Sequence, residues 1–276
     1  MNKITKELVK NWLPIREEGT YKNKMGHILC IGGNANMGGA IILSASAALY
    51  AGAGLVSVAS APENKHALHA RLPESMFVDM YDEKTLAENV EKADVIVLGP
   101  GLGLSGDSLE VFKLVINTIN KEQWLVLDGD GITHLVNETS TSKISTNNII
   151  LTPHPGEWKR LTGIKPPANS LEENKQKQKE VGATVVLKKD RTEIYIEDEV
   201  WENTAGNPSM ATGGMGDTLT GIIASLLGQY EDKKQALLSA VYMHSATADE
   251  LAETYYVTLP TEIIKYLPVF MKNLQL

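Results

Sequence analysis

Several kinds of residue are scarce in this chain of 276 residues, and each shortage excludes a class of protein. The only cysteine is Cys30, so the chain can form neither an internal disulfide nor a zinc site built from cysteines. Cys30 lies in the apolar run HILCI, where we expect a buried and unreactive thiol. Such sparing use of cysteine fits a reducing compartment, and it predicts a cytoplasmic location.

Positive charge is also in short supply. Lys and Arg number 26 against 34 Asp and Glu, which gives a formal net charge of −8. The chain therefore has no basic field to attract nucleic acid or an anionic membrane surface. The N-terminal stretch MNKITKELVKNWLPIREEG lacks the apolar core of a signal peptide. Any anionic ligand must be held by local features.

One uncharged run, residues 38–61, is long enough to span a bilayer. It is rich in small residues, however, and the sequence AGAG at 51–54 interrupts it. We therefore expect a buried helix, a glycine turn and a β-branched strand there, and no membrane span.

Short apolar runs rich in β-branched residues recur along the chain and alternate with helical stretches. They lie at 27–31, 55–59, 94–98, 124–128, 148–151 and 184–188. Several are continuously apolar, as in strands buried on both faces of a sheet. This order predicts an α/β fold with a mostly parallel central sheet and helices on both faces.

Two later segments break this pattern. Residues 191–203 alternate between apolar and polar, which predicts an antiparallel hairpin or edge, and the polar residues 166–180 predict a loop followed by an exposed helix. No linker or internal repeat divides the chain, so we expect one domain over residues 1–276.

The segments that follow the predicted strands share a composition of glycine, proline and polar residues. HILCI runs into GGNANMGGA, DVIVL into GPGLG, WLVLD into GDG, NIIL into TPHPGE, and TVVLK into KDRT. Each could be a simple turn. Because ligands bind at the carboxyl ends of strands in open parallel sheets, the five together indicate a long ligand laid across one sheet edge.

The stretch GNPSMATGGMGDTLTG, residues 206–221, leads into an apolar stripe at helical spacing that Gly228 is expected to end. GGMGD is then a helix N-terminus, where free N–H groups and glycines let an anion approach. Asp217 can simply cap the helix. Alternatively, it is a general base that takes a proton from a substrate hydroxyl while the backbone amides hold a phosphoryl group.

Three other motifs each leave two readings open. GPGLGLSG satisfies G-x-G-x-x-G, with Asp128 placed like a ribose-binding acid, or it is a tight turn. In TPHPGE, two prolines fix the loop around His154, a candidate ligand contact, while Glu157 either holds Mg²⁺ through water or begins a helix. LKKDRTEI is either a solvated turn or a loop that contacts a nucleotide.

Taken in order, the motifs GGNANMGGA, AGAGLVSVA, VLGPGLG, LVLDGDG, LTPHPGE, VVLK and NPSMATGGMGDTLTG resemble those of the ADP/ATP-dependent NAD(P)H-hydrate dehydratases. The resemblance runs from about residue 20 to the end of the chain. It implies a ribokinase-like fold and repair of the 6S hydrates of NADH and NADPH (NADHX and NADPHX). In that reaction ADP phosphorylates the ring hydroxyl, phosphate then leaves, and NAD(P)H, AMP and phosphate result.

The resemblance also implies roles for particular residues. Asp217 matches the family's catalytic acid/base, and the cofactor hydrate is contacted at Ala40, Gly103, His154 and Asp217. The adenine nucleotide is held at Lys188, Lys189, Asp190, Arg191, Thr192, Gly214 and Gly216. KDRT differs from the glycine and small residues that often follow VVLK in the family.

Family members commonly use Mg²⁺ and ADP or ATP, and they assemble as homotetramers. The chain is too short to carry a fused epimerase, so we expect a NAD(P)HX epimerase on a separate chain.

Three other functions remain as alternatives. A small-alcohol kinase of the same fold, of the hydroxymethylpyrimidine or hydroxyethylthiazole type, would release a stable phosphorylated product. A Rossmann oxidoreductase built on GPGLGLSG would exchange hydride without ADP, and a dinucleotide sensor would bind without turnover.

Overall fold

The computed structural model describes residues 1–164 and 171–276. Its strands are β1 (Asn2–Ile4), β2 (His27–Ile31), β3 (Leu55–Ser60), β4 (Met76–Asp79), β5 (Val95–Leu98), β6 (Trp124–Leu127), β7 (Ile149–Leu151), β8 (Thr184–Leu187), β9 (Glu193–Ile196) and β10 (Glu199–Asn203). Its α-helices are α1 (Lys6–Trp12), α2 (Gly38–Tyr50), α3 (Lys65–Arg71), α4 (Glu83–Lys92), α5 (Gly106–Thr118), α6 (Asp130–Glu138), α7 (Pro155–Thr162), α8 (Leu171–Val181), α9 (Met215–Gln229), α10 (Lys233–Ala252) and α11 (Pro260–Leu274).

The described strands form one ten-stranded sheet in the order β1-β10-β9-β8-β7-β6-β5-β2-β3-β4. Neighbouring strands are parallel except where β9 pairs antiparallel with β8 and β10. The predicted α/β class, the six strands and the hairpin are therefore confirmed. The single domain over residues 1–276 stays a prediction, which is supported by a sheet that joins strands from residue 2 to residue 203.

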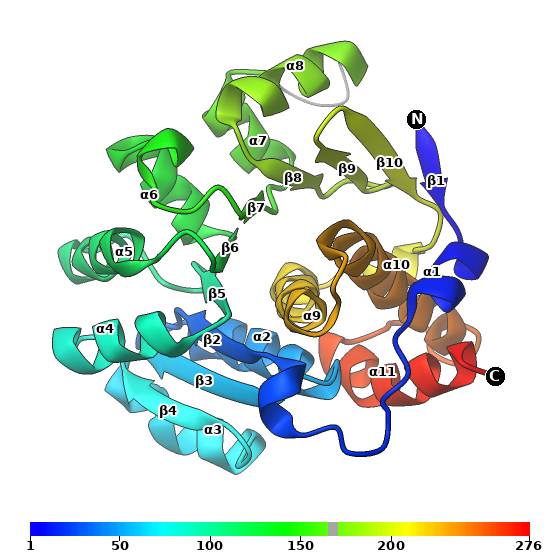
Figure 1. The fold of residues 1–276 in the computed structure, drawn as a ribbon, viewed down its shortest axis with the longest axis horizontal. Coiled ribbons are helices and arrows are strands. Elements are labelled where there is room, and N and C mark those ends of the chain that lie inside the picture. The colour runs from blue at the N-terminus through cyan, green and yellow to red at the C-terminus, as the bar shows by residue number, and fades with distance from the viewer. Residues whose placement is uncertain (165–170) are drawn as a thin grey trace.

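Helices cover both faces of the sheet, which curves around α9 in Figure 1. Alternate side chains of each central strand point to opposite faces, because the side-chain period of a strand is two. In β2, Ile28 and Cys30 join the core on the α9 side, whereas Leu29 and Ile31 join the core beneath α4, α5 and α6. The buried Cys30 thiol is as predicted.

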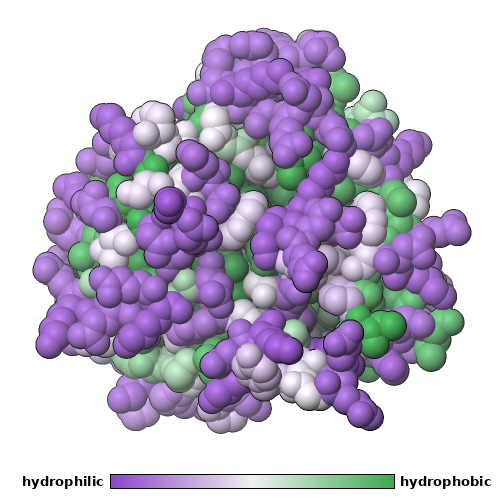
Figure 2. All heavy atoms as spheres, in the orientation of Figure 1, coloured by the Kyte–Doolittle hydropathy of each residue, from purple (hydrophilic) through white to green (hydrophobic). Residues whose placement is uncertain are grey.

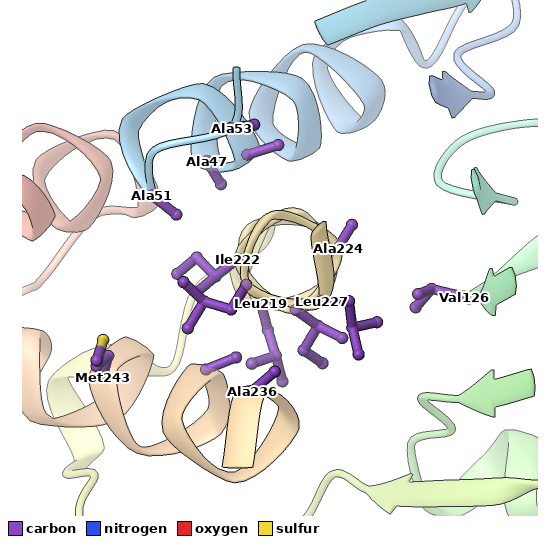
Figure 3. Close-up of a cluster of buried hydrophobic side chains, with 14 of the residues drawn as sticks. Ala47, Ala51, Ala53, Val126, Leu219, Ile222, Ala224, Leu227, Ala236 and Met243 are labelled. Atoms are coloured by element: carbon purple, nitrogen blue, oxygen red, sulfur yellow. The ribbon is translucent and has the colours of Figure 1, made fainter. Parts of the chain in front are cut away.

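Helix α9 is apolar around nearly its whole circumference, which is the pattern of a helix buried on all sides. Figure 3 shows Leu219, Ile222, Ala224 and Leu227 directed outward from it, toward small residues of α2, side chains of α10 and Val126 of β6. The contact with α2 is especially close. A Cβ atom added to Gly221 would lie 2.0 Å from the carbonyl oxygen of Ser44.

The end predicted for this helix was wrong. Gly228 does not stop α9, which continues to Gln229 with Tyr230 as its C-cap. Gly228 is instead a point of close approach, because a Cβ atom on it would lie 3.2 Å from the Cα atom of Gly26. The glycine serves helix packing and not the left-handed cap that the sequence pattern suggested.

Other segments match or extend the predictions. Residues 38–60 form α2, a turn and β3, and within the described ranges no helix has the length and hydropathy that crossing a membrane requires. Strands β1 and β4 were not predicted. The predicted helix after residue 170 is α8, whereas the loop predicted at 166–170 lies outside the described residues. Figure 2 shows that hydrophilic residues cover most of the visible face.

Replacing Gly221 by alanine is expected to lower the free energy of unfolding by about 3 kcal/mol or more, because the added methyl group collides with the α2 backbone. Gly39→Ala is the matched control. Gly39 is a glycine in α2 with no atom within 4 Å of its Cβ position, so its change is expected to stabilise by up to about 1 kcal/mol. Urea unfolding followed by circular dichroism compares the two variants; equal stability would contradict the proposed contact.

Candidate active site

The N-terminus of α9 lies at the carboxyl edge of the sheet. Gly214 is its N-cap with φ of 93°, a conformation that suits glycine, and Met215, Gly216 and Asp217 form the first turn. Backbone N–H groups of a first turn have no partner within the helix, and the helix dipole adds positive potential there. The structure therefore places the predicted anion-binding backbone next to the predicted acid/base, Asp217.

A buried ion pair closes the other side of this helix start. Asp128 directly follows β6 and is only 3% exposed, and its Oδ1 atom lies 2.6 Å from Nζ of Lys188, which directly follows β8. The Oδ2 atom lies 3.0 Å from the hydroxyl of Thr220, on the next turn of α9. A Cβ atom on Gly216 would be 3.1 Å from the Lys188 ammonium group, so that group sits against the first turn of α9.

Burial and electrostatics set the protonation of these carboxyl groups in opposite directions. Burial raises the pKa of Asp217 to about 6; the charge of Asp128 acts the same way, and the charge of Lys188 opposes both. For Asp128, burial alone would raise the pKa, yet the charge and hydrogen bond of Lys188 and the hydroxyls of Thr152 and Thr220 hold it below its usual value. Asp128 is thus ionised, and Asp217 titrates near the pH at which a general base works well.

His154 and Glu157 form the N-terminus of α7, which Pro155 begins. Nδ1 of His154 accepts a hydrogen bond from the Gly156 amide at 2.9 Å, and Glu157 Oε2 accepts one from the His154 amide at 2.8 Å, which makes a capping box. Of the two roles predicted for Glu157, the structure thus shows the one at the start of a helix. Glu157 is buried, whereas the His154 side chain is 53% exposed, and its Nε2 atom lies 3.4 Å from Glu157 Oε1.

Burial raises the pKa of Glu157 and the charge of Asp128 adds to this, while the charges of Lys188 and His154 act against it. The α7 start is therefore within electrostatic reach of the Asp128–Lys188 pair. No cluster of three or more His, Cys, Asp or Glu side chains able to hold a metal occurs in the described part of the chain.

The loops after β2 and β5 form the third part of the site. The amides of Gly33 and Asn34 donate to the carbonyls of Pro100 and Gly101 at 2.9 and 2.7 Å. A Cβ atom on Gly101 would lie 3.1 Å from that of Ala40, so the first turn of α2 rests on this loop. The predicted contacts Ala40 and Gly103 therefore lie close together, Ala40 in α2 and Gly103 in the loop on which α2 packs.

Gly103 is fixed by the helix that follows β6. Its amide donates to Asp130 Oδ2 at 2.7 Å, and its carbonyl oxygen lies 2.9 Å from Nε2 of His134, in α6. A Cβ atom on Gly103 would come within 2.8 Å of the Asn34 side-chain amide. Both backbone polar groups of Gly103 are therefore used within the protein, and its contact with a ligand stays a prediction.

The loop KDRT is largely occupied by contacts within the protein. Lys189 pairs with the buried Glu193 at 2.5 Å, and Arg191 donates to the Thr204 carbonyl at 2.7 Å. Asp190 is exposed, and the Thr192 carbonyl accepts from the Asn203 amide at 2.9 Å. Of the predicted nucleotide loop, Lys188 alone is seen here to reach the first turn of α9.

The segment before α9 is anchored to the C-terminal part of the chain. Asp249 of α10 accepts from the Gly206 amide at 2.9 Å and from the Asn207 side chain at 2.6 Å. The hydroxyl groups of Ser209 and Thr258 lie 2.6 Å apart. These contacts hold residues 206–214, the wall that leads into α9.

Sequence reasoning missed the ion pair and these anchors. Asp128 appeared only as a possible ribose-binding acid of a Rossmann site; its burial and its pairing with Lys188 leave it no such role. Thr220 of DTLTG was a signal, because a hydroxyl group on the buried side of α9 indicates a polar partner there, and it donates to Asp128. The Thr218 hydroxyl donates instead to the Gly214 carbonyl at the start of the same helix. Asp249 stands in a helical stretch without any motif that marks it.

An open, mostly parallel sheet whose carboxyl edge carries a glycine-rich helix start, a lysine and a carboxylate defines an α/β enzyme of the phosphoryl-transferring kind. A solved structure from Enterococcus faecalis described as a ribokinase-like superfamily protein superposes with a TM-score of 0.95 at 41% identity, covering 100% of this chain and 97% of that one. The ribokinase-like fold is therefore confirmed.

Residues 28–269 match the family described as NAD(P)H-hydrate dehydratase, and the chain belongs to this family. An Enterococcus faecalis protein named ADP-dependent (S)-NAD(P)H-hydrate dehydratase is 42% identical over 273 residues, 99% of this chain and 94% of that protein. A Bacillus subtilis ADP/ATP-dependent NAD(P)H-hydrate dehydratase, co-crystallised with ATP/Mg²⁺, is 28% identical with a TM-score of 0.86, covering 99% and 98% of the two chains. The family predicted from the sequence motifs is confirmed, and with it a hydro-lyase.

Asp217→Asn is expected to make stability less dependent on pH. The folded-state pKa of about 6 lies above the ordinary 3.8, so the folded wild type binds more protons between these values and loses stability as pH rises through them. The variant should exceed wild type by roughly 1–3 kcal/mol above pH 6, and the difference should vanish below about pH 4. Urea unfolding at a series of pH values measures this; a constant difference across the series would contradict the raised pKa.

Proposed function

We propose that this chain catalyses the ADP-dependent dehydration of the 6S hydrates of NADH and NADPH, giving NAD(P)H, AMP and phosphate. The observation that carries the proposal is the first turn of α9, where a titratable carboxyl group, bare glycine amides and the Lys188 ammonium group meet. Family membership and the names of the relatives supply the substrate and the nucleotide.

In the first step, Asp217 accepts the proton of the ring hydroxyl as the hydroxyl oxygen attacks the terminal phosphorus of ADP, and AMP leaves. The amides of the α9 start stabilise the charge on the transferred phosphoryl group. The C–O bond then breaks to release phosphate, a neighbouring ring carbon gives a proton to solvent water, and the carbon–carbon double bond of the dihydropyridine is restored.

The proposed nucleotide contacts are Lys188, Lys189, Asp190, Arg191, Thr192, Gly214 and Gly216, and the proposed substrate contacts are Ala40, Gly103, His154 and Asp217. Lys188 and the two glycines are supported by their position around the α9 start. Ala40 and Gly103 are supported by their proximity, because the first turn of α2 packs on the loop that contains Gly101 and Gly103.

Mg²⁺ fits this site as an ion held mainly by nucleotide phosphates and water, as is usual for this metal. The described residues offer no all-protein cage. Glu157, whose carboxylate oxygens lie 2.8 Å from the His154 amide nitrogen and 3.4 Å from His154 Nε2, would reach the ion through water. When bound, the ion would neutralise phosphate charge. This role is supported by the ATP/Mg²⁺ co-crystal of the Bacillus subtilis relative.

Four further properties of the protein stay predictions: the preference for ADP over ATP, assembly as a homotetramer, a NAD(P)HX epimerase on a separate chain, and a cytoplasmic location. The small-alcohol kinase of the same fold is the remaining alternative, and a stable phosphorylated product would distinguish it.

Incubation with NADHX, Mg²⁺ and ADP should restore absorbance at 340 nm, and kcat/KM should rise with pH through an apparent pKa of about 6 because Asp217 must be ionised to accept a proton. Asp217→Asn should lower kcat by about 10³-fold or more, since both the base and its charge are lost. ATP in place of ADP tests the nucleotide preference.

The matched control is Asp107→Asn, which changes an exposed aspartate in the first turn of α5 and should leave turnover unchanged. Folded wild-type protein that restores no NADH with either nucleotide would overturn the proposed function. Accumulation of a stable phosphorylated compound would favour the kinase.

A further inference from the structure

The cations around Asp217 are unequally available. Lys189 is paired with Glu193, and Arg191 donates to a backbone carbonyl. Lys188 is thus the cation that acts on Asp217, and its charge also acts on Asp128 and Glu157. The Lys188 ammonium group is shared among three carboxyl groups. The pKa of Asp217 therefore depends on which of the three carboxylates forms an ion pair with Lys188.

In the structure, Lys188 forms its ion pair with Asp128. The Nζ–Oδ1 distance is 2.6 Å, and Thr220 supplies a hydroxyl 3.0 Å from the second carboxylate oxygen. The backbone at Lys188 is fixed as well, because its amide donates to the Pro153 carbonyl at 2.9 Å. The backbone of Lys188 and the carboxylate that accepts from its ammonium group are therefore both fixed, and the Lys188 side chain is still 21% exposed.

We propose that Asp128 is a positioning residue, whose ion pair holds the Lys188 ammonium group against the first turn of α9 and prevents it from pairing with Asp217. An ammonium group has three hydrogens, so Lys188 can remain on Asp128 while it donates to a nucleotide phosphate. Asp217 is thereby left free to accept the substrate proton. The inference deepens the proposed function and rests on the role proposed for Asp217.

The charged and titratable groups around this pair come from several elements. Asp128 follows β6, Lys188 follows β8, and His154 and Glu157 begin α7. His244 of α10 is buried, and burial, with the charge of Lys188, lowers its pKa to about 4, so it is neutral at physiological pH. Among the described groups, Asp128 and Lys188 are those that act on Asp217 by charge, and they act in opposite directions.

The test is a ¹³C carboxyl NMR titration of the ligand-free protein, in which Asp217→Asn identifies the Asp217 resonance. Asp128→Asn should lower the Asp217 midpoint by one pH unit or more, because repulsion is lost and Lys188 can turn to Asp217. Lys188→Met should raise the upper midpoint of the coupled Asp128–Asp217 pair. Thr220→Val keeps every charge and fills the same space, so it should move the midpoint by less than half a unit.

An unchanged or raised midpoint in Asp128→Asn would overturn the inference, as would an unshifted midpoint in Lys188→Met. If Asp128→Asn does not fold, Lys188→Met decides the matter alone. The acid limb of kcat/KM should move with the NMR midpoints, a response that a merely structural aspartate would not produce. Because the titration needs no turnover, a failure to restore NADH from NADHX would count against the proposed function and not against this positioning role.

Discussion

The contact between α2 and α9 at Gly221 is the constraint on which the rest of this structure depends. The α9 backbone approaches the Ser44 carbonyl so closely that a side chain at this position has no space. With α2 fixed, α9 is enclosed by apolar side chains along its length, and its direction relative to the sheet is set. The helix therefore carries its first turn to the carboxyl edge of the strands, where Asp217 meets the ends of β6 and β8.

The chemistry of the site then follows from a shortage of positive charge. In this acidic chain, one lysine at the end of β8 interacts with three carboxyl groups. The burial of each carboxyl group and the hydroxyl groups that donate to it determine which of them stays ionised. Asp128 is buried with its hydrogen bonds satisfied and stays ionised, whereas Asp217 is desolvated without a direct partner among the described residues and becomes a better base. Two aspartates on neighbouring elements thus acquire different roles from their surroundings.

Much of this could be predicted from the sequence, because buried parallel strands are continuous β-branched runs and their ends carry distinctive glycine and proline motifs. The edge strands β1 and β4 were missed, since strands of three and four residues with exposed positions give little periodic signal. The Asp128–Lys188 pair joins residues 60 positions apart across the end of β7, and no local pattern reports such a contact. Gly228 was misread because a glycine that allows close packing and one that ends a helix look alike in sequence.

The wall before α9 has a consequence for how the protein is made. It is held by Asp249 and Thr258, which lie more than thirty positions beyond the helix start that it supports. During synthesis, the sheet strands leave the ribosome well before these two anchors do. A nascent chain can therefore assemble much of its sheet while the segment before α9 is still untethered.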